Sequence, residues 1–307
     1  MTFMENKNEA ALALRKLYQL RSGTKIDQSQ LESLMDKTSY FGFVDIEIDD
    51  LLFSMFSNND DFVARSYFWN GKDAYESTSL RIWTTLAKRS SHVIDIGSYT
   101  GVYSLAAAKS NPKSKVFAIE ALDRIYTRLL LNKRANGASN LKCFNMAITE
   151  ADHEVELFIY SGEDVLVSGS TTISEVTDRS PVESRRVQAS SLDKFVLDNK
   201  IPRLELLKID AEGAEHLIFN GAQGIVSQSK PDIICELLPT SLTESIYASL
   251  KLHGYRYYNI SESSLELIEH ETPPASNEPP DFNILMTTHT PQELEKALPF
   301  LSFVHLE

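Results

Sequence analysis

The chain has 307 residues and carries 43 acidic against 30 basic side chains, a formal net charge of −13. This balance argues against a general nucleic-acid partner, whose phosphates a protein must neutralise. No apolar run approaches the roughly 20 residues of a membrane span, and residues 1–21 carry acids where a secretory signal has a basic start. Cys143 and Cys235 lie in separate apolar runs, which favours free thiols. We therefore expect a cytoplasmic protein without a membrane partner.

Residues 1–70 are expected to form an N-terminal cap on the substrate side, because they are short and hold no repeated pattern. Apolar spacing predicts helices over 8–21 and 28–35, and alternation predicts a strand over 44–48. Residues 71–307 are expected to form the main domain.

A helix beginning near Glu76 is predicted to lead the chain into the first strand of this domain. Helices in this position often lie over a cofactor cleft, so Tyr75 and Glu76 are candidate substrate-side residues. The alternative for Glu76 is an exposed acid that stabilises the helix dipole.

The segment SHVIDIGSYTG at 91–101 predicts a strand followed by a glycine turn. Its apolar run suits a strand covered on both faces, and Gly97 and Gly101 supply flexible backbone. The next segment, VYSLAAAKS, predicts a helix. This order places main-chain N–H groups of a helix N-terminus beside the carboxyl end of a strand, where open α/β sheets bind cofactors.

The segment KVFAIEAL predicts a second strand with Glu120 at its carboxyl end. A carboxylate about 20 residues beyond the glycine turn can accept hydrogen bonds from the ribose of an adenosine-containing cofactor. A helix over 123–136 and a third strand over 140–150 follow. Alternating strands and helices predict an α/β, doubly wound sheet.

Residues 152–191 interrupt this alternation, and we expect an inserted hairpin and loop that form a substrate rim or a sheet edge. The sheet resumes at 204–209. Lys208 and Asp210 are two positions apart, so they point to one side of the strand, and Glu212 and His216 follow at the start of a helix. Lys208 is a proton acceptor only where its pKa is lowered, and otherwise holds a carboxylate in place. Further strands are predicted at 231–237, 254–260, 265–269 and 281–288.

Four segments in this order, VIDIGSYTG, VFAIEA, LLKIDAEGAEHLIFNGA and PDIICEL, resemble the class I S-adenosylmethionine-dependent methyltransferases, and among them the FkbM-type family. The resemblance implies a Rossmann-like sheet, mainly parallel with an antiparallel C-terminal hairpin strand, beside the helical cap and the β insertion. It also implies methyl transfer to a hydroxyl of a small acceptor such as a sugar or polyketide. The residues implied to bind S-adenosylmethionine are Asp95, Gly97, Ser98, Tyr99, Gly101, Glu120, Ala121, Met146, Ala147 and Asp210.

Two positions depart from the family pattern. Asparagine is common where Tyr99 stands, and phenylalanine and proline commonly flank the ribose acid where Ile119 and Ala121 stand. The glycine turn is unchanged, so we expect cofactor binding to survive with a cleft of altered shape.

For the chemistry, we expect Asp210 to lie near the methyl donor, with Glu212, Lys208 or His216 assisting deprotonation of the acceptor. The alternative is a divalent cation held by Asp210 and Glu212. Two other functions share parts of the pattern. An NAD-linked oxidoreductase would have GxGxxG where this chain has GxxxG, and a non-catalytic binding module would keep the fold without activity.

Overall fold

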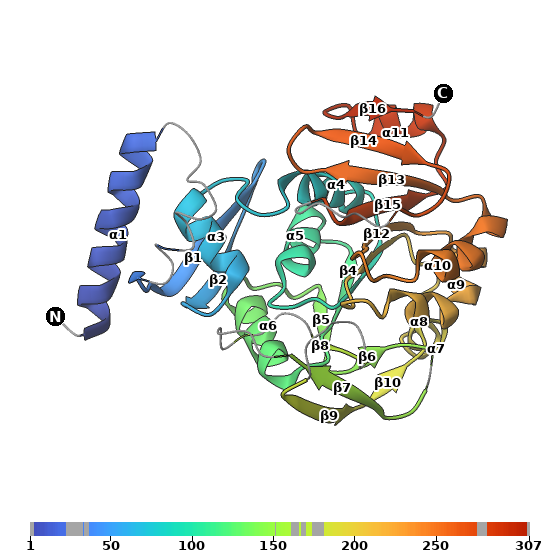
Figure 1. Cartoon of the computed structure of the whole chain (residues 1–307), viewed down its shortest axis with the longest axis horizontal. Helices are drawn as coiled ribbons and strands as arrows, with labels where there is room; N and C mark the ends of the chain where they lie inside the picture. The colour runs from blue at the N-terminus through green and yellow to red at the C-terminus, as the bar shows by residue number, and fades with distance from the viewer. Residues whose placement is uncertain are drawn as a thin grey trace.

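The computed structural model describes residues 3–22, 33, 37–150, 152–160, 166, 170–173, 181–274 and 281–305. Of the helix expected over 28–35, only residue 33 is among the described residues. Figure 1 shows a central sheet covered by helices, with α1 (Phe3–Ser22) at one end of the molecule.

The central sheet has nine strands in the order β16-β14-β13-β15-β12-β11-β3-β4-β5. Its five adjoining strands from β12 to β5 are parallel, and β15 runs antiparallel between β12 and β13. The predicted doubly wound sheet, mainly parallel with an antiparallel strand near the C-terminus, is confirmed. The strands are β3 (His92–Ile96), β4 (Lys115–Ile119), β5 (Leu141–Phe144), β11 (Leu206–Ile209), β12 (Asp232–Glu236), β13 (Arg256–Ser261), β14 (Glu266–His270), β15 (Asn283–Thr287) and β16 (Ser302–Val304).

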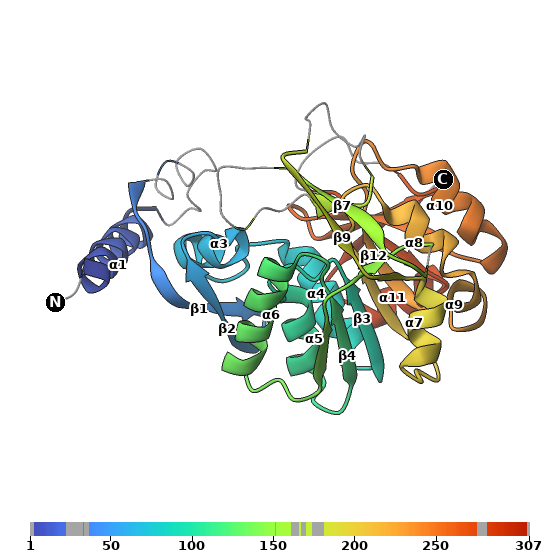
Figure 2. The same cartoon turned by 90° about the horizontal axis from the view of Figure 1, so that it is seen from below.

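Neighbouring residues of one strand enter different cores, because side chains alternate across a sheet. Val93 and Leu206 belong to one buried cluster, and Ile94 and Leu207 belong to the other. Strands buried on both faces are therefore apolar almost throughout. The first face is covered by α4 (Ser77–Ala87), α5 (Val102–Ser110), α6 (Asp123–Ala135) and α11 (Pro291–Ala297), and the second by α7 (Leu192–Asp198), α8 (Glu215–Asn220), α9 (Gln223–Gln228) and α10 (Thr243–Leu250). Figure 2 shows α5 and α6 on one side of the sheet and α7 and α9 on the other.

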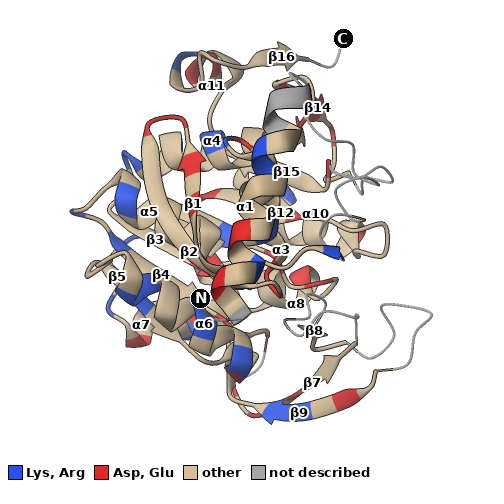
Figure 3. Cartoon of the chain, turned by 90° about the vertical axis from the view of Figure 1, so that its left-hand side faces the viewer, with Lys and Arg blue, Asp and Glu red and all other residues tan. Residues whose placement is uncertain are grey.

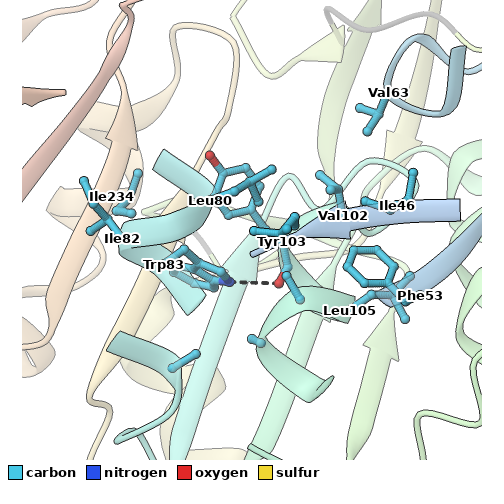
Figure 4. Packing of buried hydrophobic residues seen from close by; sticks show 14 of the residues in the cluster. Ile46, Phe53, Val63, Leu80, Ile82, Trp83, Val102, Tyr103, Leu105 and Ile234 are labelled. Carbon is cyan, nitrogen blue, oxygen red and sulfur yellow. Dashed lines mark hydrogen bonds between the residues drawn. The ribbon is translucent and has the colours of Figure 1, made fainter. Parts of the chain in front are cut away.

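The first core is built around an aromatic pair on α4 and α5. Trp83 and Tyr103 meet edge to face with ring centroids 5.5 Å apart, and the indole N–H of Trp83 donates to the main-chain oxygen of Tyr103 at 2.8 Å (Figure 4). Such pairs add specific geometry to apolar burial. The contact holds the two helices that flank the glycine turn in one orientation.

The N-terminal segment folds into α1, a hairpin of β1 (Phe41–Ile48) and β2 (Leu51–Asn58), and α3 (Phe62–Asn70). The helix over 8–21 and the strand over 44–48 agree with expectation. The second strand and α3 were not anticipated. In α3 nearly every side chain is buried, so the sequence shows no alternating polar face that would indicate a helix.

Asparagine side chains bond the main chain of the hairpin. Asn136, the C-cap residue of α6, accepts from the N–H of Ser54 at 2.9 Å and donates to its C=O at 2.6 Å, as a neighbouring strand would. Asn132, also on α6, accepts from the N–H of Phe56 at 2.8 Å. On the other strand, Asn8 of α1 makes the same two bonds with Phe41. These bonds satisfy main-chain groups at the hairpin edges and fix the hairpin to α6.

The inserted region contains a small antiparallel sheet in the order β8-β7-β9, formed by β7 (Val155–Ile159), β8 (Ser170–Thr171) and β9 (Glu183–Val187). The third strand expected over 140–150 divides in two. After β5, the chain leaves the main sheet and forms β6 (Ala147–Ile148), which pairs with β10 (Ala189–Ser190).

The C-terminal strands predicted from the sequence are present, together with a 3-10 turn at Lys251–His253. The short helix α11 and the edge strand β16 were not predicted. Over the described part of the chain, no helix is long and apolar enough to cross a membrane. Figure 3 shows both signs of charge interspersed on the face that carries α1.

Candidate active site

A cavity of about 280 Å³ lies at the carboxyl ends of β3, β4, β11 and β12. This is the edge at which parallel α/β sheets bind ligands. The N-terminal segment contributes Phe62 and Val63 to its wall, and the insertion contributes Leu157 and Ser170 to Thr172. Both additions to the sheet therefore reach the site. The remaining lining residues are Tyr75, Asp95, Ile96, Gly97, Ser98, Tyr99, Val102, Tyr103, Ile119, Glu120, Ala121, Ile125, Met146, Ala147, Ile148, Lys208, Asp210, Ala211, Glu212, Ala214 and Glu236.

The turn after β3 is tightly packed against the end of β11. Gly97 has φ +72°, and a Cβ placed on it would stand 1.7 Å from the main-chain oxygen of Asp210. Only glycine fits this position without moving backbone. Asp95, just before it, is buried and accepts from the hydroxyl of Ser104. Burial raises the pKa of Asp95 to about 6, although Ser104 and Lys208 oppose the shift.

Glu120 follows β4 and is oriented by two main-chain donors. Its carboxylate accepts from the N–H of Leu122 at 2.8 Å and from the N–H of Tyr99 at 3.1 Å. Burial raises the pKa of Glu120 to about 7, and the two N–H groups act in the opposite direction. A carboxylate held in this way presents its remaining acceptor positions in a fixed direction.

Tyr99 has the left-handed value φ +47°. Non-glycine residues pay for this conformation, and asparagine tolerates it best among the larger side chains. The asparagine common at this position in the FkbM-type family therefore has a backbone reason. Here the tyrosine ring packs against a small cluster that includes Leu122 and Ile125, and its hydroxyl donates to the C=O of Leu166 at 3.2 Å.

Lys208 is buried to 1% exposure on β11, and its Nζ lies 3.4 Å from Oδ2 of Asp210. Burial alone would lower the pKa of Lys208, but the nearby carboxylates of Asp210, Glu76 and Glu236 raise it above its ordinary value. Its ammonium also lies 5.1 Å from the ring centre of Tyr103. The raised pKa and the contact with Asp210 favour an ammonium that holds this carboxylate in place.

Glu76 stands at the N-cap of α4 with φ +39° and makes no capping bond. Instead, Glu262 from the turn after β13 caps this helix, accepting from the N–H of Thr78 at 2.7 Å and of Ser79 at 3.2 Å. Glu76 accepts from the hydroxyl of Tyr103 at 2.5 Å. Glu262 therefore satisfies the helix terminus. Glu76 contacts Tyr103, a residue that lines the cavity, but does not line the cavity itself.

The fold brings most of the predicted site residues to one cavity. Tyr75, Asp95, Gly97, Ser98, Tyr99, Glu120, Ala121, Met146, Ala147, Lys208, Asp210 and Glu212 all line it. Gly101 does not, because it starts α5 with its α-carbon facing Leu129. His216 does not line it either. It lies on α8, where its buried Nδ1 has no hydrogen-bond partner among the described atoms and burial lowers its pKa.

Several lining residues had no predicted role. Glu236 ends β12 next to the end of β11, so its place after an apolar strand was a usable signal. Phe62, Val63 and Tyr103 reach the cavity through helix packing that the sequence pattern does not encode. For the cation hypothesis, no group of three or more His, Cys, Asp or Glu side chains with metal-binding geometry occurs within the described ranges.

Comparisons with known proteins identify the family. A sequence model described as the methyltransferase FkbM domain matches residues 95–257, which is more than half of the chain. Among curated proteins, the AMB antimetabolite synthetase AmbE of Pseudomonas aeruginosa is 25% identical over 211 residues, covering 57% of this chain. The chain spans only 10% of the length of that relative.

Two solved structures are also similar. A methyltransferase FkbM from Methylobacillus flagellatus KT has a TM-score of 0.41 at 16% identity, with 74% of this chain and 55% of that chain covered. A putative SAM-dependent methyltransferase from Streptococcus mutans has a TM-score of 0.44 at 13% identity, with 81% and 56% covered. From the match of the family model over residues 95–257, the chain belongs to the FkbM methyltransferase domain family.

Proposed function

We propose that this chain uses S-adenosylmethionine to methylate a hydroxyl oxygen of a small metabolite. The observation that carries the proposal is the carboxylate of Glu120, buried and oriented by two main-chain N–H groups beside the Gly97 turn. This arrangement fits a ribose, whose two hydroxyls donate to one carboxylate. Family membership supports methyl transfer as the reaction class.

The charge of the cavity fits a cationic cofactor. Its described lining carries the carboxylates of Asp95, Glu120, Asp210, Glu212 and Glu236, against the single ammonium of Lys208. Opposite charges attract most strongly where water is excluded. S-adenosylmethionine, when bound, supplies a methyl group activated by a positively charged sulfur. Glu120 would hold its ribose, Met146 and Ala147 would lie beside its adenine, and Asp95, Gly97 and Ser98 would hold the rest.

The chain's own part in the reaction is positioning and proton removal. Lys208 holds Asp210 at the end of β11, which is separated by β3 from β4, the strand that leads to the ribose acid. Phe62, Tyr75 and Tyr103 give the acceptor side an aromatic wall that excludes water. Holding acceptor and donor in line accounts for much of the acceleration expected of such enzymes. Glu212 and the neighbouring carboxylates are placed to assist proton removal.

A small acceptor fits the rest of the molecule. The N-terminal segment and the insertion both line part of the cavity, and the net charge of −13 opposes a nucleic-acid acceptor. The curated relative is described as an antimetabolite synthetase, which also favours a small-molecule acceptor. Cys143 and Cys235 are free, which fits a reducing, cytoplasmic compartment.

The test is methyl transfer from S-adenosylmethionine carrying a 13C-methyl group to a library of hydroxylated metabolites. The proposal predicts a labelled product whose methyl carbon has the NMR shift of a methyl ether. A product labelled on nitrogen or carbon would contradict O-methylation while keeping the reaction class. Asp210→Asn, measured with and without a chelator, separates direct carboxylate chemistry from cation-assisted chemistry. A reaction abolished by chelator in the unmodified chain would favour a cation at Asp210 and Glu212.

A further inference from the structure

Glu236 ends β12 at the same edge of the sheet as Asp210. The two strands are parallel, with Ile209 paired to Cys235, so Asp210 and Glu236 each follow a paired residue. Because the strands are parallel, the two acids lie side by side at the carboxyl ends of the strands. Both line the cavity.

The carboxylate of Glu236 differs in its hydrogen bonding from those of Asp95, Glu120 and Asp210, three other acids of the cavity. Asp95 accepts from Ser104, Glu120 accepts from two main-chain N–H groups, and Asp210 is paired with Lys208. No described residue donates a hydrogen bond to the carboxylate of Glu236. A general base needs an oxygen lone pair that is open to the reacting group, so this carboxylate has the required freedom.

The groups around Glu236 come from three elements. Asp210, Glu212 and Lys208 face it from β11 and the turn that follows, Glu76 and Tyr75 face it from the start of α4, and Cys235 precedes it on β12. Burial raises the pKa of Glu236 well above its ordinary value, and the carboxylates of Asp210 and Glu212 raise it further against the effect of Lys208. One ammonium cannot compensate several carboxylates, so the cluster favours keeping a bound proton.

We propose that Glu236 is the general base that removes the proton from the acceptor hydroxyl. The inference rests on the proposed function and names a catalytic residue for it. The acceptor oxygen forms a bond to the methyl carbon as the carbon–sulfur bond breaks. That electron pair stays on sulfur, which becomes neutral, and the hydroxyl proton passes to Glu236. The proton then leaves to solvent when the product is released.

The positive charge of the cofactor changes the proton affinity of Glu236 in the course of the reaction. A cation near a carboxylate favours the ionised form, so a sulfonium in the cavity lowers the proton affinity of Glu236 and readies it to accept. After transfer the sulfur is neutral, and Glu236 again favours the protonated form. Binding of S-adenosylmethionine should therefore release more protons from the protein than binding of S-adenosylhomocysteine, which lacks the charge. The two ligands share the ribose and the amino acid group, so contributions from Glu120 cancel in the difference.

Titration calorimetry in buffers of different ionisation enthalpy measures these protons near pH 7. We expect the unmodified chain to release more protons with S-adenosylmethionine than with S-adenosylhomocysteine, and Glu236→Gln to lose that difference while binding both ligands within about threefold of the original affinity. Glu262→Gln is the matched control. Glu262 is half-buried and desolvation raises its pKa to about 7, but it caps α4 outside the cavity, so this variant should keep the difference.

The possible outcomes separate the role of Glu236 from the proposed function. A proton difference that persists in Glu236→Gln would overturn the inference and leave the proposed function intact. Equal loss of affinity for both ligands would make Glu236 a binder of the shared amino acid group, which also overturns it. Failure of the unmodified chain to bind S-adenosylmethionine would instead contradict the proposed function. With an acceptor from the library, Glu236→Gln should lower kcat about 100-fold or more and remove the acidic limb of its pH profile, and Glu236→Asp should restore part of the rate.

Discussion

Gly97 and Asp210 approach each other so closely that the cofactor turn and the end of β11 act as one structural unit. A Cβ on Gly97 would stand 1.7 Å from the main-chain oxygen of Asp210, a distance that no side-chain rearrangement relieves. The contact therefore joins the two halves of the candidate active site, one proposed to hold the cofactor and the other proposed to hold the reacting groups.

This contact makes Gly97→Ala a severe change. We expect a loss of about 4 kcal/mol or more in the free energy of unfolding, because backbone must move. Gly137→Ala is the matched control, since Gly137 also has a left-handed φ, +57°, but nothing lies within 4 Å of its added Cβ. The control should lose only about 1 to 2 kcal/mol. Chemical denaturation measures both, and equal losses would show that the close approach is unimportant.

Glu120 and Glu262 predict a pH dependence of stability. The pKa of each is raised to about 7 by burial, so the folded chain binds more protons than the unfolded chain between about pH 4.5 and 7. Their contribution to stability is complete below the unfolded pKa and is lost as pH rises through the folded value. For Glu120 the loss is roughly 3 kcal/mol, from about 1.4 kcal/mol per pKa unit. Unfolding of Glu120→Gln across this range should show a correspondingly smaller decline.

Cofactor binding should change the pKa of Glu120 and leave the pKa of Glu262 unchanged. Ribose hydroxyls that donate to Glu120 favour its ionised form, so either S-adenosylmethionine or S-adenosylhomocysteine should lower the pKa of Glu120. Glu262 lies outside the cavity and should keep its value. Carboxyl 13C NMR titration follows both residues in one sample. A ligand that shifted Glu262 and not Glu120 would place the ribose elsewhere.

The hydrogen bonds of Asn132 should determine how firmly the N-terminal hairpin is attached to α6. Its buried side chain accepts from the N–H of Phe56 and donates to the C=O of Thr100. Asn132→Ala leaves both groups unpaired, and we expect a loss of about 2 to 3 kcal/mol. Amide hydrogen exchange should accelerate in β2 and stay slow in β3 and β4. Asn199→Ala, which removes one hydrogen bond at the end of α7, should leave exchange in β2 unchanged.

Tyr99→Asn tests the departure from the family pattern. Asparagine should relieve about 1 kcal/mol of backbone cost at φ +47° but lose the burial of the ring and the bond to Leu166. We expect a net destabilisation of about 1 to 2 kcal/mol. Affinity for S-adenosylmethionine should change less than threefold, because the group that reaches Glu120 is the main-chain N–H. Tyr99→Phe removes only the hydroxyl. A lower cofactor affinity in this variant would contradict the conclusion that Tyr99 acts on the site through its main-chain N–H.

The elements that sequence patterns predicted are those with a clear apolar signature. The apolar strands β3, β4, β11 and β12, and the acids that end them, are visible because strands buried on both faces are continuous apolar runs. The helix α3 and strand β2 were missed, since α3 has no polar face and the Asp49–Asp50 turn resembles a strand end.

The site was less accessible where it depends on contacts between distant segments. Glu262 caps α4 from a position 184 residues later than Thr78, so Glu76 could not be separated from the helix dipole by local reasoning. The sequence pattern does not distinguish His216 from its neighbours in the segment after β11, but the direction of α8 leaves it outside the cavity. Phe62 begins α3 and reaches the cavity because the start of α3 lies against α6, where Arg128 pairs with Asp60, and no local pattern encodes this contact.

Titration calorimetry measures whether Glu120 binds the ribose of S-adenosylmethionine. We predict that S-adenosylmethionine and S-adenosylhomocysteine bind the unmodified chain with one ligand per chain, and that NAD does not. Glu120→Ala should weaken both ligands about 10- to 100-fold, the range for a hydrogen bond to a charged group. Glu244→Ala, an exposed acid on α10, should have no effect. Preferential binding of NAD, or full affinity for S-adenosylmethionine in Glu120→Ala, would contradict the account.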